Sequence, residues 1–199
     1  MKRIHHEVEQ NSTEWYKLRS GLFTSSPTSK LLMAPTTKGY QDYIKQIAVE
    51  RATGIPTEGF QSYYMERGHL LEDYARSYYQ AETFNVVTDG GFFTYGEEMG
   101  SSPDGLVGDK GLIEIKCPKH NTMVDYLLKD KIPPDYYKQM QHQLLVTGKQ
   151  WCDFVAYYPG LKLMIKHVLP DKEMQDAIVK ATEEAVRQVN EIIPKIKIS

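Results

Sequence analysis

One short stretch constrains this chain more than any other: Ser-Pro-Asp-Gly at residues 102–105, followed nine residues after the glycine by Glu-Ile-Lys at residues 114–116. Residues 108–110, Gly-Asp-Lys, suit a three-residue hairpin loop between two short strands. Such a hairpin places Asp104 directly opposite Glu114, with Cβ atoms roughly 5 Å apart. Two like charges at this distance repel each other unless a cation lies between them. The sequence therefore predicts a hairpin that binds a cation.

The alternation of side chains along the second strand separates a chemical face from an apolar face. Glu114 and Lys116 share one face, whereas Ile113 and Ile115 point to the other, into a core. Carboxylates together with a main-chain carbonyl such as that of Ile115 form the hard oxygen set that Mg²⁺ or Mn²⁺ prefers. Lys116 would then position an attacking water or lower its pKa. The alternative is a surface hairpin whose Glu/Lys pair contributes less than ~1 kcal/mol.

Length and composition bound the class of protein. With 199 residues, of which 41% are hydrophobic, the chain is expected to form a single domain over residues 1–199 with a helical N-terminal region. The net charge of -2 gives no global basic field, so DNA binding would need a local patch, metal ions or assembly of several subunits. Two cysteines are too few for a disulfide framework. No apolar run approaches the roughly 20 residues of a membrane span, which predicts a soluble intracellular protein.

The order of predicted elements indicates an α/β or α+β fold with a central mixed sheet flanked by helices. Helices are predicted at 14–19, after Pro27, at 40–53 and at 63–81. Strands are predicted at 86–88 and 91–95, in the hairpin, and at 151–158 and 161–168. A further helix should run from Pro133 to about Gly148, and the apolar stripe from Met174 to Ile193 predicts a long terminal helix.

Two helical residues are candidates for the same site as the hairpin. Glu72 shares a helical face with Ala75 and Tyr79, so that an acid lies among apolar neighbours. By itself Glu72 would be an ordinary surface charge, and only the hairpin makes it a candidate third carboxylate. Gln141 would bring an amide toward Lys116 or the water, with a purely structural glutamine as the alternative.

The segment around Ser26-Pro27 has the composition of a helix start. Serine at the N-cap and proline at the next position would expose free backbone N–H groups beside a hydroxyl, which is a favourable place for a phosphate. Arg19 could add a bidentate guanidinium to the same phosphate, and Trp15, one helical turn before it, could offer a stacking surface. The alternative is simple capping beside a surface arginine.

The string Ser-Pro-Asp-Gly followed by Glu-Ile-Lys-Cys-Pro resembles the PD-(D/E)xK nuclease signature. The chain as a whole resembles the phage recombination exonucleases of the lambda exonuclease, or YqaJ-type, family. The resemblance covers about residues 12 to 160 and rests on the signature and on motifs in the same order. These motifs are Trp-Tyr-Lys-Leu-Arg at 15–19, Thr-Ser-Ser at 24–26, residues 68–72, residues 137–143 with Val-Thr at 146–147, and Tyr-Tyr at 157–158.

The resemblance implies a restriction-endonuclease-like core and a 5′-to-3′ exonuclease that requires Mg²⁺. Such an enzyme digests one strand of linear double-stranded DNA and leaves a 3′ single-stranded tail for recombination by single-strand annealing. It further implies a homotrimeric ring around DNA and a single-strand annealing protein as partner. The resemblance places the protein in the cytoplasm of a bacterial host, encoded by a phage or prophage. A ring would also allow an acidic chain to line a central channel with basic residues.

The resemblance also implies roles for individual residues. The metal ligands would be Asp104, Glu114 and the main-chain carbonyl of Ile115, with Glu72 completing the site. Lys116 would assist catalysis, and Gln141 would support Lys116 or the water, although Gln139 and Gln143 lie close by and the register among the three stays open. The 5′ phosphate of the DNA end would be bound by Arg19 and Ser26, next to Trp15.

Two other readings remain open at the level of sequence. A restriction-type endonuclease or a single-strand nuclease would use the same catalytic residues, because a fold does not fix its substrate. A noncatalytic DNA-binding module would retain the fold, but the intact Asp104, Glu114 and Lys116 argue against it. Relatives with an iron–sulfur cluster are disfavoured, since two cysteines cannot ligate a four-cysteine cluster. A closed DNA circle distinguishes the two kinds of enzyme, because only an endonuclease can cut DNA that has no free end.

Overall fold

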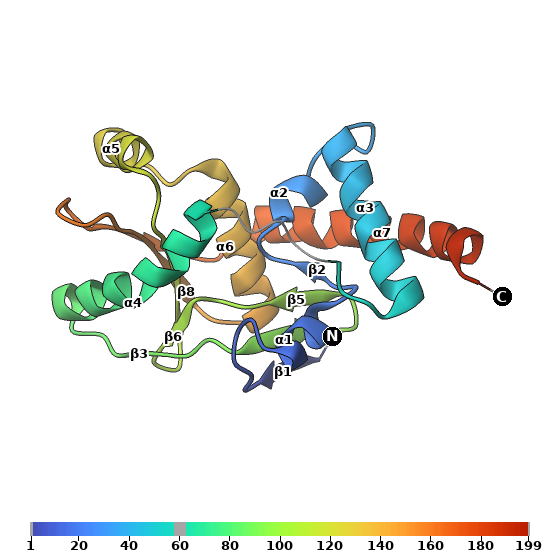
Figure 1. Ribbon diagram of the computed structural model, residues 1–199, viewed down its shortest axis with the longest axis horizontal. Coiled ribbons are helices and arrows are strands. Elements are labelled where there is room, and N and C mark those ends of the chain that lie inside the picture. Colours follow the sequence, from blue (N-terminus) through green and yellow to red (C-terminus); the bar gives the residue numbers. More distant parts are fainter. Residues whose placement is uncertain (1, 58–62, 199) are drawn as a thin grey trace.

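The computed structural model describes residues 2–57 and 63–198, in which helices surround two sheets (Figure 1). The smaller sheet has the strand order β1-β4-β5-β2. Its strands are β1 (Arg3–His6), β4 (Phe92–Tyr95), β5 (Met99–Ser101) and β2 (Phe23–Thr24). The β2 strand runs parallel to β5, whereas the other neighbours are antiparallel.

The larger sheet, which carries the predicted hairpin, has the strand order β3-β6-β7-β8-β9. Its strands are β3 (Val87–Thr88), β6 (Gly105–Val107), β7 (Gly111–Lys116), β8 (Trp151–Ala156) and β9 (Met164–Val168). Within this sheet, β7 and β8 pair in parallel, whereas the other described neighbours are antiparallel. A parallel pair needs a long crossover connection, which is supplied here by α5 (His120–Lys129) and α6 (Pro134–Thr147).

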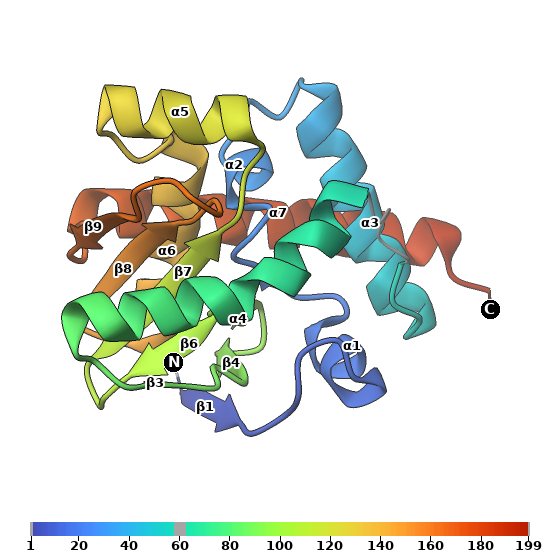
Figure 2. The same ribbon diagram turned by 60° about the vertical axis from the view of Figure 1, so that its left-hand side comes forward.

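Opposite faces of the larger sheet bury alternate residues of β7 against different helices. Ile113 and Ile115 belong to a buried cluster with Ala75 and Tyr79 of α4 (Tyr63–Thr83). Leu112 packs on the other face, in a cluster that includes α6. Figure 2 shows α4 crossing in front of the larger sheet, with α6 behind it. The predicted alternation of the strand is therefore confirmed, and the Glu114 side of β7 faces α6.

Helix α6 packs against both sheets. Met140 and Leu144 lie in the core of the larger sheet, while Val146 contacts Phe93 and Met99 of the smaller sheet. Gly148 ends the helix in the left-handed conformation, with a φ of 71°. Because the helix is enclosed on several sides, even its polar residues from Gln139 to Gln143 are buried.

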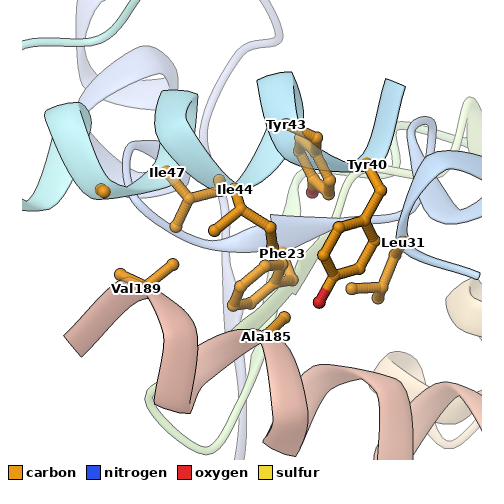
Figure 3. Packing of buried hydrophobic residues seen from close by; sticks show 9 residues of the cluster. Phe23, Leu31, Tyr40, Tyr43, Ile44, Ile47, Ala185 and Val189 are labelled. Atoms are coloured by element: carbon orange, nitrogen blue, oxygen red, sulfur yellow. The ribbon is translucent and has the colours of Figure 1, made fainter. Parts of the chain in front are cut away.

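Helices α2 (Thr28–Leu31), α3 (Lys38–Thr53) and α7 (Lys172–Ile196) form a second packing region, shown from close by in Figure 3. The short helix α1 (Thr13–Arg19) contributes no residue to this cluster. Ile44 and Ile47 of α3 pack against Ala185 and Val189 of α7, with Phe23 between them. The apolar stripe predicted for the terminal helix packs in this cluster from Ala181 onward. No helix in the described ranges is long and apolar enough to cross a membrane.

The predicted mixed α/β fold is confirmed, with three differences in its elements. The sequence patterns missed α5 and the strands β1, β2 and β5. The helix after Pro27 is a single turn, and its N-cap is Pro27 rather than Ser26, without a side-chain cap hydrogen bond. Instead, the Thr28 hydroxyl donates to the Ser25 carbonyl at 2.6 Å. The expectation of a serine-capped helix start at Ser26 is therefore wrong.

A buried polar chain joins α6 to the smaller sheet. The Ser25 hydroxyl lies 2.9 Å from Nδ1 of His142 and 2.9 Å from the Ser101 hydroxyl. Burial lowers the pKa of His142 to about 4, against a smaller raising effect of the Phe23 backbone. His142 is therefore neutral in the folded protein at neutral pH.

The low pKa of His142 predicts acid sensitivity of the fold. Between pH 6.5 and about 4 the unfolded chain binds a proton at this histidine that the folded protein excludes. The free energy of unfolding should therefore decrease as the pH falls through this window, by up to about 3 kcal/mol. Urea denaturation at several pH values should show a shallower pH dependence for His142→Gln than for the wild type. The exposed His120→Gln serves as control and should keep the wild-type slope; equal slopes in all three proteins would contradict this.

Candidate active site

The hairpin brings the two predicted carboxylates together. Gly105 pairs with Ile113 and Val107 with Gly111 across β6 and β7, so one step further Asp104 lies opposite Glu114. The loop between the strands contains Gly108 with a φ of 55°, a conformation that glycine adopts without strain. Packing is tight at the start of β6, where a Cβ on Gly105 would lie 2.4 Å from Val87. The predicted register is confirmed.

Glu114 is a buried carboxylate held by three side-chain donors. Its side chain points to α6 and the residue is only 1% exposed. Gln139 Nε2 donates to Oε1 at 2.6 Å and Gln143 Nε2 donates to Oε2 at 2.5 Å, while Lys116 forms an ion pair with Oε1. A buried carboxylate is costly unless it is hydrogen-bonded and paired, and here both conditions are met.

Asp104 lies in a field of other negative charges. Burial raises its pKa well above the ordinary value, and the charges of Glu114 and Glu72 raise it further, against the opposing effects of Lys116 and of the Ile115 amide. Glu72 of α4 is therefore near enough to act on Asp104. Asp104 and Glu114 thus lie opposite each other across the hairpin, and the charge of Glu72 acts on Asp104 from α4.

The Asp104 carboxylate is oriented by the neighbouring strand. The Ile115 amide donates to Asp104 Oδ2 at 2.6 Å. This contact lies just beyond the last β6–β7 pair, Gly105 with Ile113. Because the N–H and C=O of a residue in an extended strand point the same way, the Ile115 carbonyl also faces the Asp104 side. Arg76 of α4 fixes the backbone, since its Nη2 donates to the Asp104 carbonyl at 2.8 Å. Arg76, which the sequence analysis does not single out, is a positioning residue here.

Lys116 remains protonated in this site. Burial lowers the pKa of its ammonium, but the charges of Glu114 and Asp104 and the hydrogen bond to Glu114 outweigh burial and raise the pKa above its ordinary value. The ammonium also lies 5.2 Å from the centroid of the Tyr136 ring. Lys116 can therefore donate hydrogen bonds and stabilise negative charge, but it is not available as a base.

The glutamine prediction requires a correction. Gln141 does not approach the carboxylates, because its Nε2 donates to the Leu169 carbonyl at 2.8 Å and its Oε1 accepts from the Asp171 amide at 2.8 Å. Residues at a spacing of two lie on nearly opposite sides of a helix, so Gln141 faces the start of α7 while Gln139 and Gln143 face Glu114. The two glutamines at the site share one face at a spacing of four.

Trp15 and Arg19, which the sequence predicts to lie at a phosphate site, are found next to the segment just before Asp104. Trp15 is only 7% exposed, its Nε1 donates to Ser102 Oγ at 3.0 Å, and the Arg19 guanidinium lies 4.2 Å from its ring centroid. The expectation of an open stacking surface at Trp15 is therefore wrong, because the ring packs under Arg19. The Arg19 side chain is half-buried, and this burial lowers the pKa of its guanidinium. Ser26 is exposed, whereas Ser25 is bound to Ser101.

The donor set suits a hard divalent cation. Burial first, and then the charges of Glu114 and Glu72, raise the pKa of Asp104, so a cation close to its carboxylate would offset both effects. Within the described residues the Asp104 carboxylate accepts a hydrogen bond only from the Ile115 amide, so most of its lone pairs stay available. Asp104, Glu114, Glu72 and the Ile115 carbonyl are oxygen donors of the kind that Mg²⁺ prefers. Among the described residues, no three His, Cys, Asp or Glu side chains already form a metal-ligand group.

Comparison with known proteins identifies a family and solved structures that are similar to this chain. Residues 14–150 match the family model described as YqaJ-like viral recombinase domain. The crystal structure of LHK-Exo in complex with dAMP has a TM-score of 0.86 and 34% identity, covering 93% of this chain and 96% of that chain. The alkaline exonuclease LHK-Exo from Laribacter hongkongensis, solved in a second structure, has a TM-score of 0.85, also at 34% identity, with coverage of 93% and 96%.

A phage-related exonuclease from Haemophilus somnus 129PT shares the fold, with a TM-score of 0.69 and 15% identity over 92% of this chain and 99% of that chain. None of the curated proteins matches the chain. The family model spans most of the sequence, and it includes Glu72, Asp104, Glu114 and Lys116. This chain therefore belongs to the family of YqaJ-like viral recombinase domains, with the fold of the alkaline exonucleases.

Proposed function

We propose that this protein is a Mg²⁺-dependent 5′-to-3′ exonuclease that acts on the ends of linear double-stranded DNA and leaves a 3′ single-stranded tail. The observation that carries the proposal is that Asp104 and Glu114 lie opposite each other on the hairpin, beside Lys116, which is ion-paired with Glu114. The charge of Glu72 acts on Asp104 from α4, and Lys116 stays protonated. Excess negative charge in a buried site is an arrangement that a resident cation stabilises, and DNA phosphates need the same neutralisation.

The residues of the site divide the work of phosphodiester hydrolysis. Asp104, Glu114, Glu72 and the Ile115 carbonyl would hold the metal, with Mn²⁺ as a possible substitute. A bound Mg²⁺ supplies Lewis acidity that neutralises charge on the phosphate and favours a hydroxide nucleophile. Lys116 donates a hydrogen bond to the attacking water or to a phosphate oxygen, since its raised pKa excludes a role as base.

The 5′ polarity rests on the region around Arg19. Trp15 holds the guanidinium of Arg19 and is itself bound to Ser102, two residues before Asp104. A guanidinium at this place can bind a terminal phosphate and so set which end of the strand enters the site. Ser26 would add its exposed hydroxyl to the same phosphate. The relative LHK-Exo was solved with dAMP, a nucleotide of the kind that an exonuclease releases, which supports mononucleotide products here.

The proposal extends to the setting of the reaction. The 3′ tail would serve homologous recombination of the phage type, with a single-strand annealing protein as partner, in the cytoplasm of a bacterial host. The family match to a viral recombinase domain supports this setting. A homotrimeric ring would reconcile the net charge of -2 with DNA binding, because assembly can concentrate basic residues around a channel.

Substrate choice and metal dependence can be tested together. Purified protein is incubated with linear duplex DNA labelled on each strand and with a closed circle, with EDTA, Mg²⁺ or Mn²⁺. We expect loss of label from the 5′ ends of the linear DNA, an intact circle and no reaction in EDTA. Cleavage of the circle would instead identify an endonuclease, and the absence of any metal-dependent cleavage would favour a noncatalytic module.

Replacement of the carboxylates should abolish catalysis without unfolding the protein. We expect Asp104→Asn and Glu114→Gln to lower kcat by at least about 10²-fold, because each removes a negative charge from the metal ligand set. Asp109→Asn, in the exposed hairpin loop, is the matched control and should retain wild-type rates. Circular dichroism should confirm that all three variants are folded. Wild-type rates in Asp104→Asn would exclude the proposed site.

The role of Arg19 predicts a loss of preference for phosphorylated ends. We expect Arg19→Ala to lower kcat/KM on 5′-phosphorylated duplexes by roughly 10- to 100-fold, the usual size of a charge-assisted hydrogen bond. The rate on 5′-hydroxyl duplexes should change much less. Lys17→Ala, an exposed cation on the same helix α1, controls for a general loss of positive charge. An equal decrease on both kinds of end would show that Arg19 does not read the phosphate.

A further inference from the structure

The first turn of α6 places an aromatic ring next to the reactive lysine. Pro133 caps the helix and Pro134 opens it, which fixes the direction of this turn. Tyr136 follows, and its spacing to Gln139 and Gln143 is three and then four, so the three side chains share one helical face. This face is the one that meets Glu114. Tyr136 therefore extends the row of glutamines toward the end of β7.

The Lys116 ammonium lies between two attractive groups. On one side it forms an ion pair with Glu114, and on the other its Nζ lies 5.2 Å from the centroid of the Tyr136 ring. A cation at this distance from the face of an aromatic ring is attracted by the negative charge density of the ring, most strongly where water is partly excluded. The side chain of Lys116 is only 25% exposed.

The Tyr136 ring is itself fixed by the core. It stacks on Phe154 with centroids 5.7 Å apart and an interplanar angle of 26°. Phe154 is fully buried on β8 and pairs with Glu114 across the parallel strands. Tyr126 of α5 packs on the same Phe154 at 6.4 Å, and its pKa is raised first by burial and then by the neighbouring Tyr136. The ring that faces Lys116 thus has little freedom to move.

We propose that Tyr136 is a positioning residue that holds the Lys116 ammonium at the site through a cation–π contact. The inference rests on the proposed nuclease function. Glu114 must offer its oxygens as ligands, which weakens its hold on Lys116. The ring of Tyr136 then supplies the attraction that keeps the ammonium in place, where it can donate to the reacting phosphate or water. The aromatic face is required for this role, whereas the phenol hydroxyl is not.

The test compares variants that keep or remove the ring. We expect Tyr136→Phe to keep kcat within about twofold, and Tyr136→Leu to lower kcat by about tenfold while KM changes less than about twofold. Tyr137→Phe and Tyr137→Leu are matched controls, since they change the neighbouring tyrosine of α6, whose hydroxyl donates to Asp171 instead. Both controls should keep the wild-type kcat, whatever their effect on stability in urea denaturation.

A second readout does not depend on activity. In metal-free protein, the NMR signals of the Lys116 ε-methylene protons should be shifted upfield by the Tyr136 ring. The shift should persist in Tyr136→Phe and Tyr137→Leu and be lost in Tyr136→Leu. If Tyr136→Leu keeps the wild-type kcat, or Tyr137→Leu loses as much, the positioning role is overturned while the nuclease proposal stands. A wild-type protein that cleaves no DNA overturns both.

Discussion

The buried carboxylate of Glu114 is the constraint around which the site is organised. Its desolvation has to be offset by hydrogen bonds, and these come from Gln139 and Gln143 of α6 and from Lys116. The same helix also packs on both sheets, through Met140 on one side and Val146 on the other. The requirement to satisfy one acid therefore fixes the rotation of α6, and α6 in turn fixes how the two sheets meet.

Local pairing explains why the hairpin could be predicted in detail. The register between Asp104 and Glu114 depends on a three-residue loop and on the alternation of side chains. Both can be recognised within one short segment of the sequence. The long terminal helix was equally clear, because a single apolar stripe marks its buried face. The resemblance to the phage recombination exonucleases was also confirmed by the comparisons.

Features that depend on tertiary contacts were missed or misplaced. Helix α6 is buried almost all round, so its pattern carries no polar face from which the rotation could be read, and Gln141 was chosen where Gln139 and Gln143 face the acid. Trp15 offered a stacking surface in sequence, but the fold covers it with Arg19. The strand β2 spans only Phe23–Thr24 and exists through its pairing with β5, which no local pattern records.

The alternating glutamines of α6 also restrict where insertions and deletions can be accommodated in this family. Gln141 binds the segment that leads into α7, whereas Gln139 and Gln143 bind Glu114. Glutamines two residues apart on one helix therefore belong to two separate hydrogen-bond networks. A single inserted or deleted residue would rotate everything beyond it by about 100° and move the displaced glutamines away from their partners. Natural variation in chain length is therefore expected to accumulate in the surface loops, and α6 to evolve by substitution alone.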